Sequence, residues 1–161
     1  MRQNALLRSA KGLGVPSTAR KEDRKTKLVV ATPGLADDSH DHFVVRNGVR
    51  CAGVHLIVDL YDAKRLNDID HIETTLRRCV DAAGATLLHI HLHHFTPSGV
   101  SGVAVLAESH ISIHTWPEIG YAALDVFMCG KANPNECVPV LREAFKAKRV
   151  AVSEMLRGQG S

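Results

Sequence analysis

The sequence predicts an α+β protein: an antiparallel sheet with two helices packed on one of its faces. Three observations lead to this class. Short runs alternate apolar with polar residues, which is the pattern of half-buried strands. Two stretches, 67–84 and 134–145, carry apolar residues at helical spacing. Most strand runs follow one another over short turns, which favours antiparallel hairpins, so the predicted order is β-α-β-β-β-β-α-β.

The first strand of the predicted sheet is 49–61, a nearly continuous apolar run that is typical of a central strand. His55 and Asp59 are polar residues within it, and their even spacing puts them on one face. Either can be a satisfied polar group of the core. The last strand is predicted at 149–156.

Both predicted helices have recognisable ends. The first begins at Asn67 or Asp68, whose side chain can cap the N-terminus, and ends at Gly84. The second begins near Pro134, since proline is favoured at a helix start. The apolar stripes are Ile69, Ile72, Leu76, Val80 and Ala83 in the first helix, and Val138, Leu141, Ala144 and Phe145 in the second.

A row of histidines marks the strand predicted at 85–95. His89, His91 and His93 alternate onto one face, a spacing that can bind a transition metal. No cysteine or carboxylate joins them within the strand. We therefore expect an exposed or interface-facing row and no metal site.

The N-terminal part differs in composition from the rest. Residues 1–26 are basic and lack an apolar stripe, and 27–32 can form a short strand. His40 and His42 stand among acidic residues in what we interpret as an exposed polar loop. We expect residues 1–45 to be a basic, disordered extension and residues 46–161 to be the folded domain.

Composition narrows the class of protein further. A formal charge of +3 is too small to indicate a nucleic-acid partner, and no apolar run is long enough to span a membrane. The four cysteines form no C-x-x-C pair and follow no secretory segment. We expect free thiols in a reducing cytoplasm.

Residues that carry chemistry gather in the stretch 106–130. Glu108-Ser109 places an acyl group before a hydroxyl that can attack it, and His110 and His114 are nearby bases. A hairpin around residues 116–118 can return Cys129 toward Ser109. Ser109 and His114 are five positions apart, which puts them on opposite faces of an ideal strand. We therefore expect a turn or bulge near Glu108-Ser109 that re-aims one of them.

This stretch closely resembles the bacterial S-adenosylmethionine decarboxylase proenzyme family. The resemblance covers residues 50–130 densely and leaves the first 45 residues uncovered. The matching segments are Glu108-Ser109-His110, 113–118, 120–122, 125–127 and Cys129-Gly130, preceded by Gly53, His55-Leu56, Tyr61, Phe95 and 99–103.

The resemblance implies a self-processing, pyruvoyl-dependent decarboxylase that supplies decarboxylated S-adenosylmethionine for spermidine and polyamine synthesis. It implies cleavage between Glu108 and Ser109 into chains 1–108 and 109–161, and a homodimer with pockets near its interface. The implied roles are pyruvoyl precursor for Ser109, processing base for His114, proton donor to the substrate carbon for Cys129, assisting serine for Ser101 and adenine-stacking ring for Phe95. The bare face of the predicted sheet also favours pairing of two protomers.

Decarboxylation of an amino acid leaves a carbanion that ordinary side chains cannot delocalise, so an electron sink is needed. The sequence lacks a glycine-rich phosphate-binding loop beside a lysine suited to form a Schiff base. Pyridoxal phosphate is therefore disfavoured as the electron sink. A pyruvoyl group can be made from Ser109 itself. The hydroxyl attacks the Glu108 carbonyl to give an ester, elimination breaks the chain, and hydrolysis of the remaining residue gives the ketone.

The substrate is the open question of the sequence. Phe95 and Trp116, the only tryptophan, offer surfaces for an adenine and a sulfonium cation. Asp62 is a carboxylate that could hold the distal cation of ornithine or arginine. Departures from the usual family pattern are Val54, Asp62, Ala63, His94 and Met128. We favour S-adenosylmethionine; the alternatives are an ornithine or arginine decarboxylase and an unprocessed, non-catalytic dimeric or metal-binding module.

Overall fold

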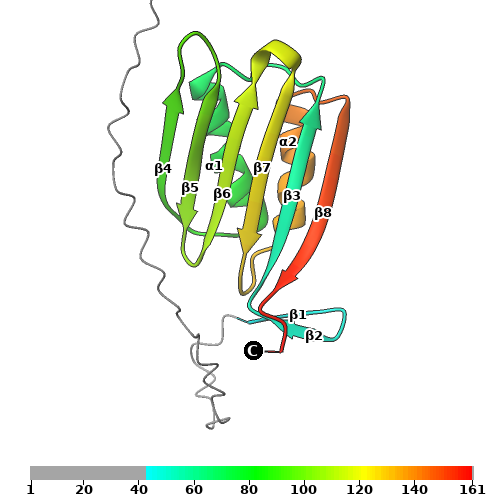
Figure 1. The fold of residues 1–161 in the computed structure, drawn as a ribbon. Helices are drawn as coiled ribbons and strands as arrows, with labels where there is room; N and C mark the ends of the chain where they lie inside the picture. The colour runs from blue at the N-terminus through cyan, green and yellow to red at the C-terminus, as the bar shows by residue number, and fades with distance from the viewer. Residues whose placement is uncertain (1–42, 161) are drawn as a thin grey trace, which may run out of the picture. The chain divides into compact units, whose positions relative to one another are not determined.

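The structure, a computed structural model, describes residues 43–160 (Figure 1). The expectations for the basic segment 1–26, the strand at 27–32 and the loop with His40 and His42 lie outside the described residues. Among the described residues, no helix is long and apolar enough to cross a membrane.

A six-stranded antiparallel sheet forms the centre of the described part, in the order β4-β5-β6-β7-β3-β8. Neighbouring strands along β4 to β7 are joined by hairpins, whereas β3 enters between β7 and β8 (Figure 1). The bounds are β3 Gly53–Tyr61, β4 Leu87–His94, β5 Val100–Leu106, β6 Ser109–Trp116, β7 Tyr121–Met128 and β8 Arg149–Arg157.

Helices α1 (Ile69–Ala83) and α2 (Cys137–Ala144) cover one face of this sheet (Figure 1). The Asp68 side chain caps α1 by accepting a hydrogen bond from the His71 N–H at 3.0 Å, and Gly84 ends the helix in the left-handed conformation. Short 3₁₀ turns occur at η2 (Pro117–Ile119) and, just before α2, at η3 (Pro134–Glu136). The predicted class is confirmed, and the predicted order of elements matches the chain from β3 to β8.

The core lies between the sheet and the helices. Alternate residues of β3, β6 and β7 point into it, together with the predicted stripes of both helices. Its largest fully buried side chains include Leu56, Leu60, Ile72, Leu76, Ile113, Leu124, Leu141 and Phe145. This burial fixes which residues of each strand are left for the opposite face.

The predicted strand at 49–61 is in fact two strands. The chain forms a small hairpin, β1 (Val44–Arg46) with β2 (Val49–Cys51), before β3 begins at Gly53. Asn47 and Gly48 make its turn, both with positive φ, which is the conformation that an Asn-Gly pair favours. The break between β2 and β3 is not visible in the sequence, because both strands contribute residues to one apolar run.

The face of the sheet away from the helices, here called the open face, carries polar side chains together with several apolar ones. It carries His55 and Asp59 as predicted, since β3 alternates between buried and half-buried residues. The exposed histidine row of β4 also lies here, with the rings of His89 and His91 6.4 Å apart and nearly parallel. Within residues 43–160, no three His, Cys, Asp or Glu side chains are placed to hold a metal ion.

Candidate active site

The Glu108-Ser109 peptide lies in the tight turn between β5 and β6. Leu106 pairs with Ser109, so the turn has only two residues, Ala107 and Glu108, and both are exposed. Glu108 has a φ of 62°, a left-handed conformation that costs a residue with a Cβ about 1–3 kcal/mol. Backbone strain is therefore stored next to the peptide bond that the sequence marks for rearrangement.

Ser109 and Cys129 meet at this end of the sheet, as the predicted hairpin requires. The Cys129 N–H donates a hydrogen bond to the Ser109 Oγ at 3.2 Å, and Ser109 is only 9% exposed. The pKa of the Cys129 thiol is raised, mainly because burial disfavours the thiolate, and further by the nearby Glu108 carboxylate and Cys51. We call Glu108, Ser109 and Cys129 the cleavage half-site.

His114 is not part of this half-site within one protomer. Strand β6 pairs without a register shift with β5 and β7 over residues 109–116. The turn before Ser109 therefore re-aims neither residue and no bulge occurs over these residues, so that expectation is wrong. Ser109 therefore points with Ile111 toward the helices, and His114 points to the open face. Five residues of strand also separate the two by about 16 Å.

At the other end of β6, His114 lies with three more of the predicted residues. The Ser101 Oγ and the His114 Nδ1 are 2.8 Å apart in a hydrogen bond across strands β5 and β6. Phe95, Ser101, His114 and Trp116 line a cavity of about 290 Å³, in which Phe95 is 47% and Trp116 is 40% exposed. We call these four residues the binding half-site.

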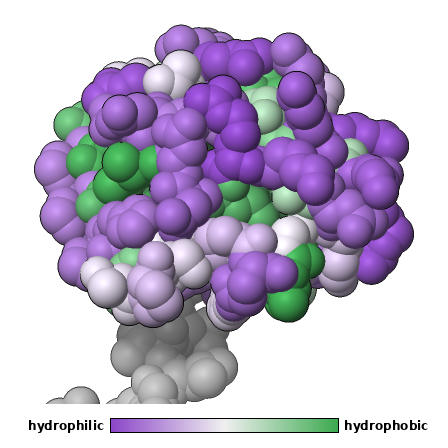
Figure 2. Space-filling model, turned by 90° about the horizontal axis from the view of Figure 1, so that it is seen from above, coloured by the Kyte–Doolittle hydropathy of each residue, from purple (hydrophilic) through white to green (hydrophobic). Residues whose placement is uncertain are grey.

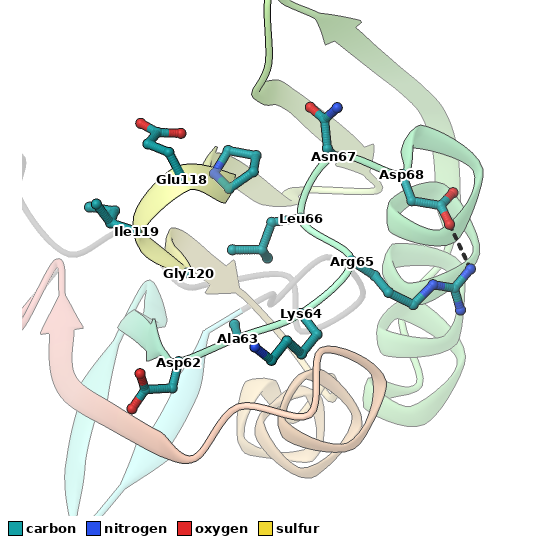
Figure 3. Close-up of a pocket in the computed structure, with 11 residues that line it drawn as sticks. Asp62, Ala63, Lys64, Arg65, Leu66, Asn67, Asp68, Glu118, Ile119 and Gly120 are labelled. Atoms are coloured by element: carbon teal, nitrogen blue, oxygen red, sulfur yellow. Dashed lines mark hydrogen bonds and ion pairs between the residues drawn. The ribbon is translucent and has the colours of Figure 1, made fainter.

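Asp62 lies outside the binding half-site. It lines a separate cavity of about 630 Å³ between the loop 62–68 and η2, and its exposed side chain points away from η2 (Figure 3). Arg65 in the same loop pairs with Asp68 at 2.6 Å. This end of the molecule is largely hydrophilic, with a few hydrophobic side chains showing between polar ones (Figure 2).

Glu118 was not predicted to be a site residue, although it lies in the matching segment 113–118. Glu118 is exposed, is the one residue that lines both cavities and is a carboxylate at the edge of the binding half-site. Its position depends on η2, where Gly120 packs closely against Ala63 and accepts the Ala63 N–H at 2.9 Å. Such a contact across loops leaves no periodic signal in a sequence.

A further titratable cluster occupies the middle of the open face. Ser112 donates a hydrogen bond to Asp125 at 3.0 Å, and the His55 Nε2 lies 3.3 Å from the other oxygen of that carboxylate. Partial burial, reinforced by His55, lowers the pKa of His110. Since Ser109 points to the other face, the ring of its neighbour His110 projects away from it.

The architecture and the cleavage half-site define a class: a two-layer α+β protein in which a serine hydroxyl lies beside a strained acyl group. Comparison with known proteins identifies the family more specifically than this structural class does. Residues 54–158 match the family described as S-adenosylmethionine decarboxylase. The chain belongs to the S-adenosylmethionine decarboxylase family, as the sequence motifs indicated.

Individual relatives agree with this assignment. An S-adenosylmethionine decarboxylase proenzyme of Methanococcus aeolicus is 48% identical over 109 residues, which are 66% of this chain and 93% of that protein. The proenzyme of Thermomicrobium roseum is 45% identical over 68% of this chain and 97% of its own. The crystal structure of the adenosylmethionine decarboxylase from Aquifex aeolicus superposes with a TM-score of 0.62 at 34% identity, covering 67% of this chain and 92% of that one.

Proposed function

We propose that this protein is a self-processing, pyruvoyl-dependent S-adenosylmethionine decarboxylase, which supplies decarboxylated S-adenosylmethionine for spermidine and polyamine synthesis. The observation that carries the proposal is the cleavage half-site. Ser109 is nearly buried, its oxygen accepts the Cys129 N–H, and the residue before it is strained. The family membership and the relatives' names support the choice of reaction.

The chain's own groups account for the cleavage. The Ser109 hydroxyl attacks the Glu108 carbonyl carbon, and the amide becomes an ester with a free amine at residue 109. Loss of the Ser109 α-proton to a base breaks the Cβ–Oγ bond and leaves Glu108 as a carboxylate. The dehydroalanine at residue 109 tautomerises to an imine, and water replaces its nitrogen as ammonia to leave a ketone. The left-handed Glu108 favours the first step, because the rearrangement releases its strain.

The residues present fit a pyruvoyl group at position 109. Such a group, once formed, supplies the electron sink that decarboxylation needs. Ser109 lies at the start of β6 with the Cys129 backbone N–H 3.2 Å from its oxygen, so a donor is in place for a polar group there. The Cys129 thiol is the nearby acid, and its raised pKa keeps it protonated near neutral pH.

A second protomer explains why the two half-sites are apart. Two sheets packed through their open faces, with the two-fold axis perpendicular to the strands, place the start of β6 opposite the end of the partner's β6. The partner's His114 and Ser101 then reach the exposed turn at Glu108, and each dimer has two complete sites. Exposed apolar side chains on the open face, Val105, Trp116 and Met155, support a homodimer.

The binding half-site favours S-adenosylmethionine over a basic amino acid. Phe95 and Trp116 present two partly exposed rings beside the Ser101–His114 pair, as an adenine and a sulfonium require. Asp62, the carboxylate proposed for ornithine or arginine, lines a different cavity. The four cysteines are free, in keeping with the expected cytoplasmic location.

The test is carbon dioxide release from carboxyl-labelled S-adenosylmethionine, ornithine and arginine by the purified, cleaved protein. We expect release from S-adenosylmethionine only, and its loss in Phe95→Ala but not in Asp62→Gly. Release from ornithine or arginine that Asp62→Gly abolishes would contradict the substrate assignment. Cleaved protein that decarboxylates none of the three would contradict the proposed activity.

A further inference from the structure

The β1–β2 hairpin lies before the residues that match the family model. The match begins at residue 54, whereas the hairpin spans residues 44–51. None of the residues to which a role has been proposed lies in the hairpin. Its Asn47-Gly48 turn and regular pairing make it a defined element of structure.

Several contacts join the hairpin and Ala52, which follows it, to β8 and to the residues just after β8. The Ala52 N–H donates to the Arg157 carbonyl at 2.8 Å, and the Gly160 N–H donates to the Arg50 carbonyl at 3.3 Å. Arg46 forms an ion pair with Glu154 at 3.1 Å. Figure 1 shows the hairpin at the end of the sheet where β7 and β8 finish and β6 begins, which is the end that carries the cleavage half-site.

The exit of the hairpin packs closely against the residues before Cys129. A Cβ on Gly53 would lie 2.7 Å from the Met128 carbonyl oxygen and from the Phe127 ring, so the backbone approaches β7 as closely as it can. Cys51, two residues earlier, is completely buried, with its Sγ 3.6 Å from the Val44 carbonyl oxygen. A short hairpin buries a side chain completely only when other parts of the molecule cover it.

We propose that the β1–β2 hairpin forms the outer wall of the cleavage half-site, and that Cys51 is a positioning residue that shields the Cys129 thiol from water. The inference rests on the proposed role of Cys129 as the acid of the reaction. The proposal extends the site to a hairpin that lies before the family-model match, and it assigns a role to the buried Cys51.

The physical consequence concerns the protonation of Cys129. Burial is the largest cause of its raised pKa, and the groups that act on it electrostatically are Glu108, from the β5–β6 turn, and Cys51, from β2. Opening the hairpin admits water and removes Cys51, and both changes stabilise the thiolate. The Cys129 thiol then deprotonates at lower pH, so a smaller fraction of it carries the proton that the reaction needs.

The experiment measures alkylation of Cys129 by iodoacetamide in the full chain, between about pH 6 and pH 10, with the modified peptide quantified by mass spectrometry. Cys51→Ala removes the shielding thiol. Gly48→Val opens the turn, because its φ of +78° strains a β-branched residue although nothing lies within 4 Å. We expect both variants to be alkylated at least about threefold faster near neutral pH, with the midpoint moved to lower pH.

Gly84→Val is the matched control. Gly84 has a φ of +69° and the same open space, but it lies at the end of α1. Unchanged midpoints in both hairpin variants, or an equal shift in Gly84→Val, would overturn the proposal. Alkylation is measured whether or not the chain has cleaved itself, so a failure of the proposed decarboxylase activity would not be mistaken for a failure of this inference.

Discussion

At the scale of single residues, Cys129 contributes to the cleavage half-site in two separable ways. Its backbone N–H donates to the Ser109 Oγ, and its thiol is a weakly acidic group with a raised pKa. A substitution of the Cys129 side chain removes the thiol and leaves the backbone N–H in place. The proposed roles of Cys129 in cleavage of the chain and in protonation of the substrate carbon can therefore be tested separately.

Replacement of Cys129 by alanine is expected to slow cleavage only modestly, because the N–H remains, and to reduce correct decarboxylation by about 10²-fold or more. Cleavage is followed by gel electrophoresis and turnover by product analysis. Full turnover by Cys129→Ala would remove this thiol from the mechanism.

The pH dependence of turnover follows from the same pKa. Since burial raises the pKa of the thiol, its protonated form persists to higher pH than in an ordinary cysteine, and the rate should fall only when pH rises through that raised value. A kcat profile for the cleaved enzyme measures this directly. An alkaline fall that is unchanged in Cys129→Ser would show that another group titrates.

The sequence predicted the meeting of Ser109 with Cys129, because one hairpin suffices to bring their strand ends together. The five-residue spacing also indicated that His114 and Ser109 lie on opposite faces, from which we expected a turn or bulge to re-aim one of them. The β6 pairings are regular instead, and Ile111 and Ile113 in the core fix the register. Periodicity within one protomer also cannot identify the residues that a proposed second protomer would bring to the site.

At the scale of elements, the turn between β5 and β6 places a strained residue, Glu108, next to the proposed cleavage bond. Glu108→Gly relieves a left-handed conformation and should raise the free energy of unfolding of the uncleaved chain by about 1 kcal/mol, after allowance for glycine's greater freedom when unfolded. It should also slow cleavage. Denaturant unfolding of the precursor and the cleavage half-time are the two measurements.

Lys146→Gly is the control for this turn. Its φ of 49° carries similar strain just after α2, far along the chain from the cleavage half-site. We expect similar stabilisation and unchanged cleavage. If Glu108→Gly cleaves at the normal rate, strain at the turn does not assist the reaction.

The elements themselves were mostly predictable. Helical stripes with Asp68 and Gly84 at the ends of α1, and alternation in β7, identify their elements without tertiary information. The β1–β2 hairpin was missed although Asn47-Gly48 is a strong turn signal, because the surrounding valines merge with β3 into one apolar run. The loop 62–68 could not be placed from sequence, since it is held by distant partners such as Gly120 and Phe145.

At the scale of the whole molecule, the proposed sharing of each site between two protomers makes a prediction about mixed dimers. Ser109→Ala and His114→Ala chains should each be inactive alone, because every site in either homodimer lacks one residue. Co-expressed with random pairing, half of the dimers are mixed and one of their two sites is intact, so activity should recover to about one quarter of wild type. No recovery in dimers shown to be mixed would contradict a site shared between protomers.

The most direct test of the central claim, that Ser109 converts itself into a ketone at a new chain end, is the intact mass of the purified protein. Conversion adds one water and releases one ammonia, so the two fragment masses should sum to about 1 Da more than the precursor. The N-terminal fragment should end at Glu108, and the C-terminal fragment should begin at residue 109 with a blocked N-terminus. A single uncut chain after prolonged incubation, or fragments that sum to about 18 Da more than the precursor as simple hydrolysis requires, would contradict the account.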